Sequence, residues 1–171
     1  MRKIYRDFVT TEEAEKILKD ISQNGKYYLK KRLNKLDYIT KIIDTVKKDF
    51  DFEISEYSYF KREVRNSHKP HPWHKDTGSK NHMPWCQVGI SLLLKEPGFG
   101  GETYYAKDND LFEKKYNGID FYNIENKSIR DAITNKVKSD RGLYDLVAHT
   151  SDEWHEVTGT DGTRCALLMF I

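Results

Sequence analysis

Cysteine is scarce in this chain, with two among 171 residues. Cys86 and Cys165 both lie in apolar, strand-like runs, so we expect buried, reduced thiols and no disulfide framework. Long apolar runs are missing too, because the longest, near Gly89–Leu94, falls far short of the about 20 residues that a membrane helix needs. Residues 1–7 contain no apolar signal core. These absences predict a soluble, cytoplasmic protein with no membrane partner.

An excess of one charge is also absent, since 29 basic and 27 acidic residues leave a net charge of +2. A disordered polyelectrolyte needs high net charge and few aromatics, whereas 13% of these residues are aromatic. A protein that binds mainly by neutralising phosphates needs a clear basic excess. The composition disfavours both classes, and the length predicts a single domain over residues 1–171.

Residues 10–50 predict two helices that support the rest of the domain. Thr10 and Glu13 have the spacing of a capping box, and apolar residues follow at helical intervals. Asn24-Gly25 is expected to end this first helix. The apolar residues from Leu36 to Phe50 repeat the helical pattern with charged residues on the opposite face.

From Phe52 onwards the apolar residues alternate with a period of two, which predicts strands. We expect these strands at residues 52–60, 86–94, 102–105, 143–148, 153–157 and 164–171. Residues 107–141 interrupt the strand pattern and predict an insertion with one short helix, of the kind that builds a substrate-specific rim. The fold class is therefore α+β, with the strands forming a sandwich or barrel.

His74 and Asp76 form the first group that could carry chemistry. In an extended segment, side chains two residues apart project to the same side, so the two can converge on one point. His155 could supply a third ligand, with His149 as its competitor. Two histidines and one carboxylate on one face of a metal are typical of non-haem Fe(II) oxygenases, but six histidines also allow other pairings.

Arg164 lies nine residues after His155 and opens an alternating strand that runs to Ile171. Asp161-Gly162 is expected to form a hairpin turn that brings Arg164 alongside His155. A guanidinium inside an apolar strand needs an anionic partner. Either a carboxylate of the protein or a carboxylate of a ligand could fill that role, the latter through a bidentate fork.

Taken together, His74-x-Asp76, Gly100-Gly101-Glu102-Thr103, and His155 with Arg164 resemble the 2-oxoglutarate/Fe(II)-dependent dioxygenases. Within that superfamily the chain is most similar to the prolyl 4-hydroxylase-like branch, over roughly residues 52–171. The resemblance implies a double-stranded β-helix, a jelly-roll or cupin-like barrel, backed by helices at about residues 10–50. The Gly-Gly-Glu-Thr segment would shape the mouth of that barrel.

The resemblance also implies roles for particular residues. The Fe(II) ligands, and so the catalytic centre, would be His74, Asp76 and His155. Arg164 would bind the distal carboxylate of 2-oxoglutarate, and either Tyr57 or Tyr59 would contact this co-substrate. The implied cofactors are Fe(II), 2-oxoglutarate and O2, with ascorbate as an optional reductant.

The implied reaction is hydroxylation of a prolyl or other residue in a peptide, coupled to decarboxylation of 2-oxoglutarate to succinate and CO2. Hydroxylation of a free amino acid or small molecule is an alternative. A second alternative is a non-catalytic metal-binding β-barrel in which Arg164 pairs with an internal carboxylate. Many relatives have Ser or Thr where this chain has Ala166, and base-repair relatives have a second Arg where it has Phe170. Phe170 and the near-neutral charge disfavour a nucleic-acid substrate, and the oligomeric state is left open.

Several other residues have simpler interpretations. We expect loop positions for His68, His71 and His82. For Trp73, Trp85 and Trp154 we expect core packing, with the wall of a substrate pocket as the alternative. A solvated basic face is expected for Lys127, Arg130, Lys136 and Lys138.

Overall fold

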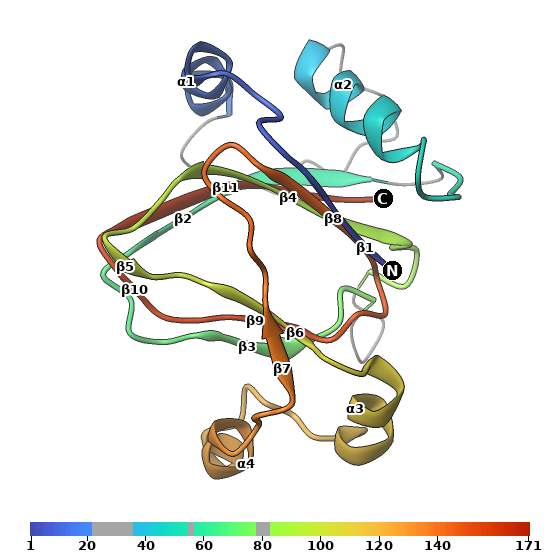
Figure 1. The fold of residues 1–171 in the computed structure, drawn as a ribbon, viewed down its shortest axis with the longest axis vertical. Coiled ribbons are helices and arrows are strands. Elements are labelled where there is room, and N and C mark those ends of the chain that lie inside the picture. Colours follow the sequence, from blue (N-terminus) through green and yellow to red (C-terminus); the bar gives the residue numbers. More distant parts are fainter. Residues whose placement is uncertain (22–35, 55–56, 78–82) are drawn as a thin grey trace.

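A computed structural model describes residues 1–21, 36–54, 57–77 and 83–171 (Figure 1). The strands are β1 (Arg2–Tyr5), β2 (Ser58–Arg65), β3 (His71–His74), β4 (Val88–Lys95), β5 (Phe99–Gly100), β6 (Thr103–Ala106), β7 (Lys136–Lys138), β8 (Leu146–Thr150), β9 (His155–Val157), β10 (Thr160–Asp161) and β11 (Thr163–Phe170). The helices are α1 (Thr11–Asp20), α2 (Asp37–Val46), α3 (Asn109–Tyr116), the 3-10 turn η1 (Ile124–Asn126) and α4 (Lys127–Asp131).

The strands form two main antiparallel sheets that lie one above the other (Figure 1). The large sheet has the order β1-β8-β4-β11-β2, and the small sheet has the order β3-β9-β6-β7. The short pair β10-β5 lies at one side of the two layers. Helices α1 and α2 lie over the outer face of the large sheet, and α3 and α4 lie on the far side of the small sheet. This mixture of helices and antiparallel sheets confirms the predicted α+β class.

The two leading helices begin and pack as their sequence pattern predicts. The Thr10 side chain accepts from the Glu13 amide, and the Glu13 carboxylate accepts from the Thr10 amide, which completes the capping box. Helix α2 ends at Val46, a turn earlier than the apolar pattern suggests. The expected stop at Asn24-Gly25 lies outside the described residues.

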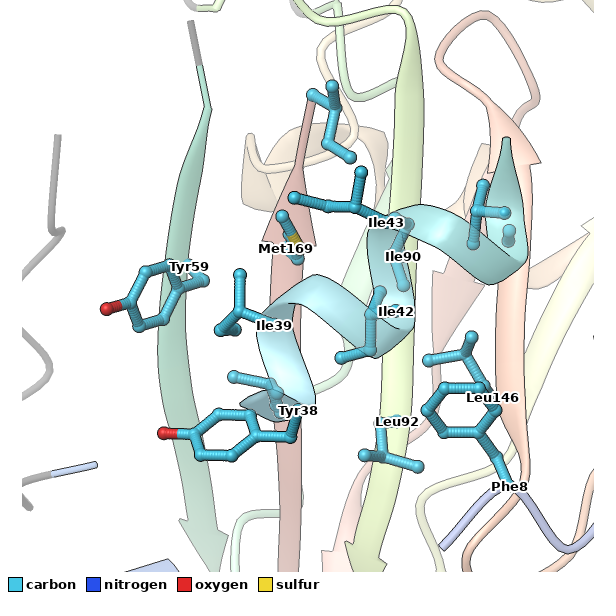
Figure 2. Close-up of a cluster of buried hydrophobic side chains, with 14 of the residues drawn as sticks. Phe8, Tyr38, Ile39, Ile42, Ile43, Tyr59, Ile90, Leu92, Leu146 and Met169 are labelled. Carbon is cyan, nitrogen blue, oxygen red and sulfur yellow. The ribbon is translucent and has the colours of Figure 1, made fainter. Parts of the chain in front are cut away.

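A first hydrophobic core fills the space between these helices and the large sheet (Figure 2). Ile39 and Ile42 of α2 are fully buried over Leu92 and Met169 of the sheet. Each such side chain contributes roughly 1.5–3 kcal/mol when it leaves water. Because side chains alternate along a strand, the residues of β11 next to Met169 face the other way, toward the small sheet.

A second core covers the outer face of the small sheet, and the insertion supplies much of it. Phe112, Phe121 and Ile133 pack there against Trp73 and Trp154. The insertion is therefore a packing layer as well as a connection. The burial of Trp73 and Trp154 in this cluster confirms that both tryptophans pack in a core.

Several expected strand boundaries differ from the structure. The first long strand starts at Ser58 and continues to Arg65, and the strands β1, β3 and β7 were not expected at all. The predicted hairpin is wrong: β9 pairs with β3 and β6, while β11 pairs with β2 and β4. Gly162, with a φ of 93°, turns the chain from β10 into β11, so that β9 and β11 lie in different sheets.

The remaining composition-based expectations concern cysteines, basic residues and membranes. Both thiols are free and buried, and burial raises the pKa of Cys86 to about 12 and that of Cys165 to about 11. The four residues of the expected basic face each lie within ion-pair distance of an acidic group: Lys127 and Arg130 near Asp131, Lys136 near Glu156, and Lys138 near Glu102. Among the described residues, no helix has both the length and the apolar character to cross a membrane.

Candidate metal centre

His74, Asp76 and His155 converge at the ends of two neighbouring strands of the small sheet. His74 ends β3 and pairs in register with His155, the first residue of β9. Asp76 follows two residues after β3, where its amide donates to the Ser151 carbonyl at 3.0 Å. One donor atom from each of the three side chains lies within 4.8 Å of the other two. The structure thus brings together the three predicted ligands.

The hydrogen bonds of the two imidazoles orient their free nitrogens toward the carboxylate. Nδ1 of His74 donates to the Pro72 carbonyl at 2.7 Å, and Nδ1 of His155 donates to the Glu153 carbonyl at 2.9 Å. A carbonyl can only accept, so Nδ1 carries the proton and Nε2 presents a lone pair. These Nε2 atoms lie 3.9 Å and 3.7 Å from Asp76 Oδ1. Such backbone contacts are the usual means of orienting metal-binding histidines.

The surroundings keep His74 in the protonation state that binds metal. Burial, followed by the neighbouring His155 and His71, lowers the pKa of His74 well below its usual 6.5. His74 is therefore neutral at physiological pH, and a neutral imidazole is the form that ligates a metal. Two nitrogens and one carboxylate oxygen match the donor set that Fe(II) takes in facial triads. The donor chemistry of these residues therefore fits the metal.

Gly89 on β4 of the large sheet leaves the room that Asp76 occupies. A Cβ at this position would lie 1.8 Å from Asp76 Oδ2 and 2.7 Å from Cε1 of His149. Neither distance is compatible with a side chain. The carboxylate therefore reaches across from the small sheet to the inward face of the large one, and only glycine permits this approach.

His149, the competing third ligand, lies beside this group on β8. Its Nε2 is 3.5 Å from Asp76 Oδ2, and its ring centroid is 4.6 Å from that of His155. Its Nδ1 donates to the Thr150 carbonyl at 3.1 Å. It belongs to the same cluster, but the compact set of donor atoms is formed with His155.

Arg164 is buried on the inward face of β11, with 4% of its surface exposed. Its Nε donates to the Gly101 carbonyl at 3.1 Å. Gly101 has a φ of 73°, and a Cβ there would lie 2.8 Å from Arg164 Cδ, so the Gly-Gly turn makes room for this side chain. Burial, together with Arg141 and Arg62, lowers the pKa of Arg164 to about 9. In the described parts of the chain, no carboxylate lies within 4.0 Å of this guanidinium.

Tyr57 and Tyr59 do not join this group. Both are buried in the first core, on the helix-covered side of the large sheet, and Figure 2 shows Tyr59 beside Ile39 of α2. The expectation that one of them contacts the co-substrate does not agree with this placement. The physical reason is strand parity, since β2 directs Phe60 and Arg62 inward and Tyr59 outward.

Other aromatic residues that the sequence analysis missed do lie beside the cluster. Tyr105 pairs in register with His155, with ring centroids 5.7 Å apart, and burial raises the pKa of its phenol. His71, expected in a solvated loop, belongs to β3 and makes an edge-to-face contact with His74, with ring centroids 4.2 Å apart. The Tyr122 hydroxyl lies 3.3 Å from the His71 ring nitrogens. Thr103 and Tyr105 are two residues apart on β6 and so share a face, which could have indicated Tyr105 from the sequence. No local sequence pattern indicates the position of Tyr122.

The other single residues have simple outcomes. His68 is exposed, as expected for a loop histidine, and Trp85 is partly buried. His82 lies outside the described residues.

No family model matches the chain, and no curated protein matches its sequence. Solved structures do match its fold. A Pseudomonas putida prolyl-4-hydroxylase aligns with a TM-score of 0.64 at 12% identity, over 99% of this chain and 83% of that one. The viral collagen prolyl hydroxylase of Paramecium Bursaria Chlorella virus-1, in its 2OG complex, gives 0.57 at 11%, over 99% and 94%.

A 2OG-Fe(II) oxygenase family protein from Burkholderia pseudomallei aligns with a TM-score of 0.60 at 12% identity, over 99% of this chain and 82% of that one. The resemblance to the prolyl 4-hydroxylase-like branch is therefore confirmed at the level of the fold. Identities this low carry the fold and leave the activity to be argued from the residues.

Proposed function

We propose that this protein is an Fe(II)/2-oxoglutarate-dependent oxygenase that hydroxylates a prolyl or other residue in a peptide. The observation that carries the proposal is the convergence of His74, Asp76 and His155 between the two sheets. The buried guanidinium of Arg164 supports it, because a co-substrate carboxylate would provide the anion that this side chain lacks. The fold is similar to that of a prolyl-4-hydroxylase and of a 2OG-Fe(II) oxygenase family protein.

In this proposal His74, Asp76 and His155 hold Fe(II), and Arg164 binds the distal carboxylate of 2-oxoglutarate. When bound, the metal and co-substrate supply the oxidative decarboxylation to succinate and CO2 and the coupled hydroxylation of a C–H bond by O2. The protein's part is geometric. The Nδ1 hydrogen bonds keep each Nε2 facing Asp76, and the two packed sheets shield the site from water.

The proposal extends to the architecture and to the reductant. The two facing sheets would close into a double-stranded β-helix, and residues 1–171 would form one dioxygenase domain with an insertion at about residues 107–141. Ascorbate would serve as an optional reductant. The rim formed by Tyr122 and His71 would meet the substrate, since this pair lies directly against His74.

A peptidic substrate is favoured over a small molecule by the named activities of two fold neighbours, a prolyl-4-hydroxylase and a collagen prolyl hydroxylase. Succinate release across a panel of proline-containing peptides, free amino acids and oligonucleotides tests this choice. Release with peptides alone supports it. Release with free amino acids alone moves the assignment to the small-molecule alternative.

Anaerobic addition of Fe(II) and then 2-oxoglutarate tests the reaction class. We expect a visible metal-to-ligand charge-transfer band that saturates with co-substrate. Arg164→Ala should weaken 2-oxoglutarate binding by about 10- to 100-fold, the worth of a charge-assisted bidentate contact, and leave Fe(II) binding intact.

Arg65→Ala is the matched control for Arg164→Ala. Arg65 lies on the outward face of β2, 67% exposed and ion-paired with Glu63. A protein that binds Fe(II) but gives no band with 2-oxoglutarate would instead be the non-catalytic metal-binding alternative.

A further inference from the structure

A second arginine reaches the space between the two sheets from the end of the insertion. Arg141 follows β7 by three residues, and its Nη1 donates to both the carbonyl and the hydroxyl of Ser91, at 3.2 Å and 2.8 Å. Ser91 lies on β4 two residues after Gly89, and therefore on the same face as the glycine that accommodates Asp76. The guanidinium of Arg141 is thus held on the inward face of the large sheet.

Arg141 influences the charge of Arg164. The nearby Arg141 lowers the pKa of Arg164, and burial lowers the pKa of Arg141 itself. Glu96 and Asp145 attract Arg141 only from beyond ion-pair distance. Across the described ranges, no carboxylate lies within 4.0 Å of either guanidinium. A buried guanidinium and a partly buried one held close together are costly unless an anion joins them.

The space beside the two arginines is large enough for such an anion. A cavity of about 290 Å³ is bordered by both guanidinium-bearing side chains, with Gly101 and Thr103 on its wall. A water molecule occupies roughly 30 Å³, so the cavity can hold a small carboxylate. Ala166, two residues after Arg164 on the same face, contributes no polar atom.

We propose that Arg141 is a second guanidinium of the co-substrate site, and that it binds the distal carboxylate of 2-oxoglutarate together with Arg164. This inference rests on the proposed function and names a specificity-determining residue within it. Two guanidinium groups around one carboxylate favour a 2-oxo acid with a distal negative charge over one that lacks it. Ser91 holds Arg141 in place through its carbonyl and its hydroxyl.

The test compares two co-substrates on anaerobic, Fe(II)-loaded protein. 2-Oxopentanoate has the same chain length as 2-oxoglutarate but carries a methyl group in place of the distal carboxylate. In Arg141→Gln we expect the Kd for 2-oxoglutarate, measured from the charge-transfer band, to rise about 10- to 100-fold. The Kd for 2-oxopentanoate should change by less than about 2-fold, since the lost contact involves the carboxylate alone.

Matched variants distinguish the loss of the Arg141 charge from a general change in the structure. Arg65→Gln removes an exposed guanidinium from the outward face of β2 and should leave both Kd values unchanged. Ser91→Ala retains Arg141 but removes one of its hydrogen bonds, and should weaken 2-oxoglutarate alone by about 3- to 10-fold. This variant and Arg141→Lys keep the proposal falsifiable if Arg141→Gln does not fold.

An equal loss of affinity for both co-substrates, or no loss for either, overturns the assignment of Arg141. Fe(II) affinity measured before co-substrate is added should be the same in Arg141→Gln and the unaltered protein, and a parallel loss of metal binding also overturns it. Failure of the proposed function is distinguishable, because the unaltered protein would then give no band with 2-oxoglutarate.

Discussion

Replacing Gly89 with alanine should remove metal binding without changing any of the three ligands. Gly89 has no positive φ that would strain an alanine backbone, so the substitution acts through its single added methyl group. That methyl would be placed 1.8 Å from Asp76 Oδ2. To reach van der Waals contact, the carboxylate must retreat by roughly 1.5 Å.

The size of this displacement decides the outcome. Metal–ligand distances are held to within about 0.2 Å, so a shift of roughly 1.5 Å takes Asp76 out of coordination. Mutation of a residue that only hydrogen-bonds to a metal ligand already lowers metal affinity by about 10- to 100-fold. We therefore expect Gly89→Ala to bind Fe(II) at least about 100-fold more weakly, which corresponds to about 2.7 kcal/mol.

Anaerobic Fe(II) titration followed by calorimetry measures this loss, and circular dichroism monitors the fold. Gly98→Ala is the matched control, because a Cβ there makes only an ordinary contact, 3.7 Å from the Asp161 carbonyl. Overpacking should cost Gly89→Ala roughly 1–3 kcal/mol of stability. That cost should be smaller in an Asp76→Ala background, where the nearer of the two clashing groups is gone.

Native-like Fe(II) affinity in a folded Gly89→Ala protein would refute the reasoning. It would mean either that Asp76 is no ligand or that its carboxylate does not lie against β4. A stability cost that is identical with and without the Asp76 carboxylate would contradict the contact itself.

Two further predictions concern the rest of the molecule. The raised pKa values of Cys86 (about 12) and Cys165 (about 11) predict no alkylation by iodoacetamide at pH 8 until the chain is unfolded. Because these thiols retain protons that the unfolded chain releases near pH 9, stability should fall as pH rises from about 9 to 12 in urea titrations; constant stability would contradict the burial. Asp145 is buried and accepts from the amides of Asp7 and Gly142, both at 2.8 Å, so Asp145→Ala should lower the free energy of unfolding by roughly 2–3 kcal/mol. Burial alone would raise the pKa of Asp145, but hydrogen bonds from these two amides lower it below its usual value. The stability that ionised Asp145 contributes should therefore be lost only as the pH falls below the usual pKa of an aspartate. A loss that begins near neutral pH would argue against these hydrogen bonds.

Much of the local structure followed from the sequence. The capping box fixed where α1 begins, and alternation located β4, β6, β8, β9 and β11 to within a few residues. The convergence of His74 and Asp76 followed from the geometry of extended chain, since their spacing of two needs no knowledge of the rest of the fold.

The wrong predictions share one cause. The alternation of apolar and polar residues shows that a strand has two faces, but it does not show what covers each face. Either Tyr57 or Tyr59 was expected on the site face, but the helices cover their side of the large sheet. His155 and Arg164 were joined by a hairpin, but their strands belong to opposite sheets that direct both side chains inward.

The positions of the two cysteines, the period of the apolar residues and the spacing of His74 and Asp76 determined by themselves the buried free thiols, the α+β class and a candidate His-x-Asp pair. Only the tertiary structure decided that Gly89 makes room for Asp76 and that Arg141 shares a cavity with Arg164. Local preferences depend on neighbouring residues, which the sequence states directly. The placement of side chains from distant strands depends instead on how whole faces are buried against one another, and that is settled only when the sheets and helices pack.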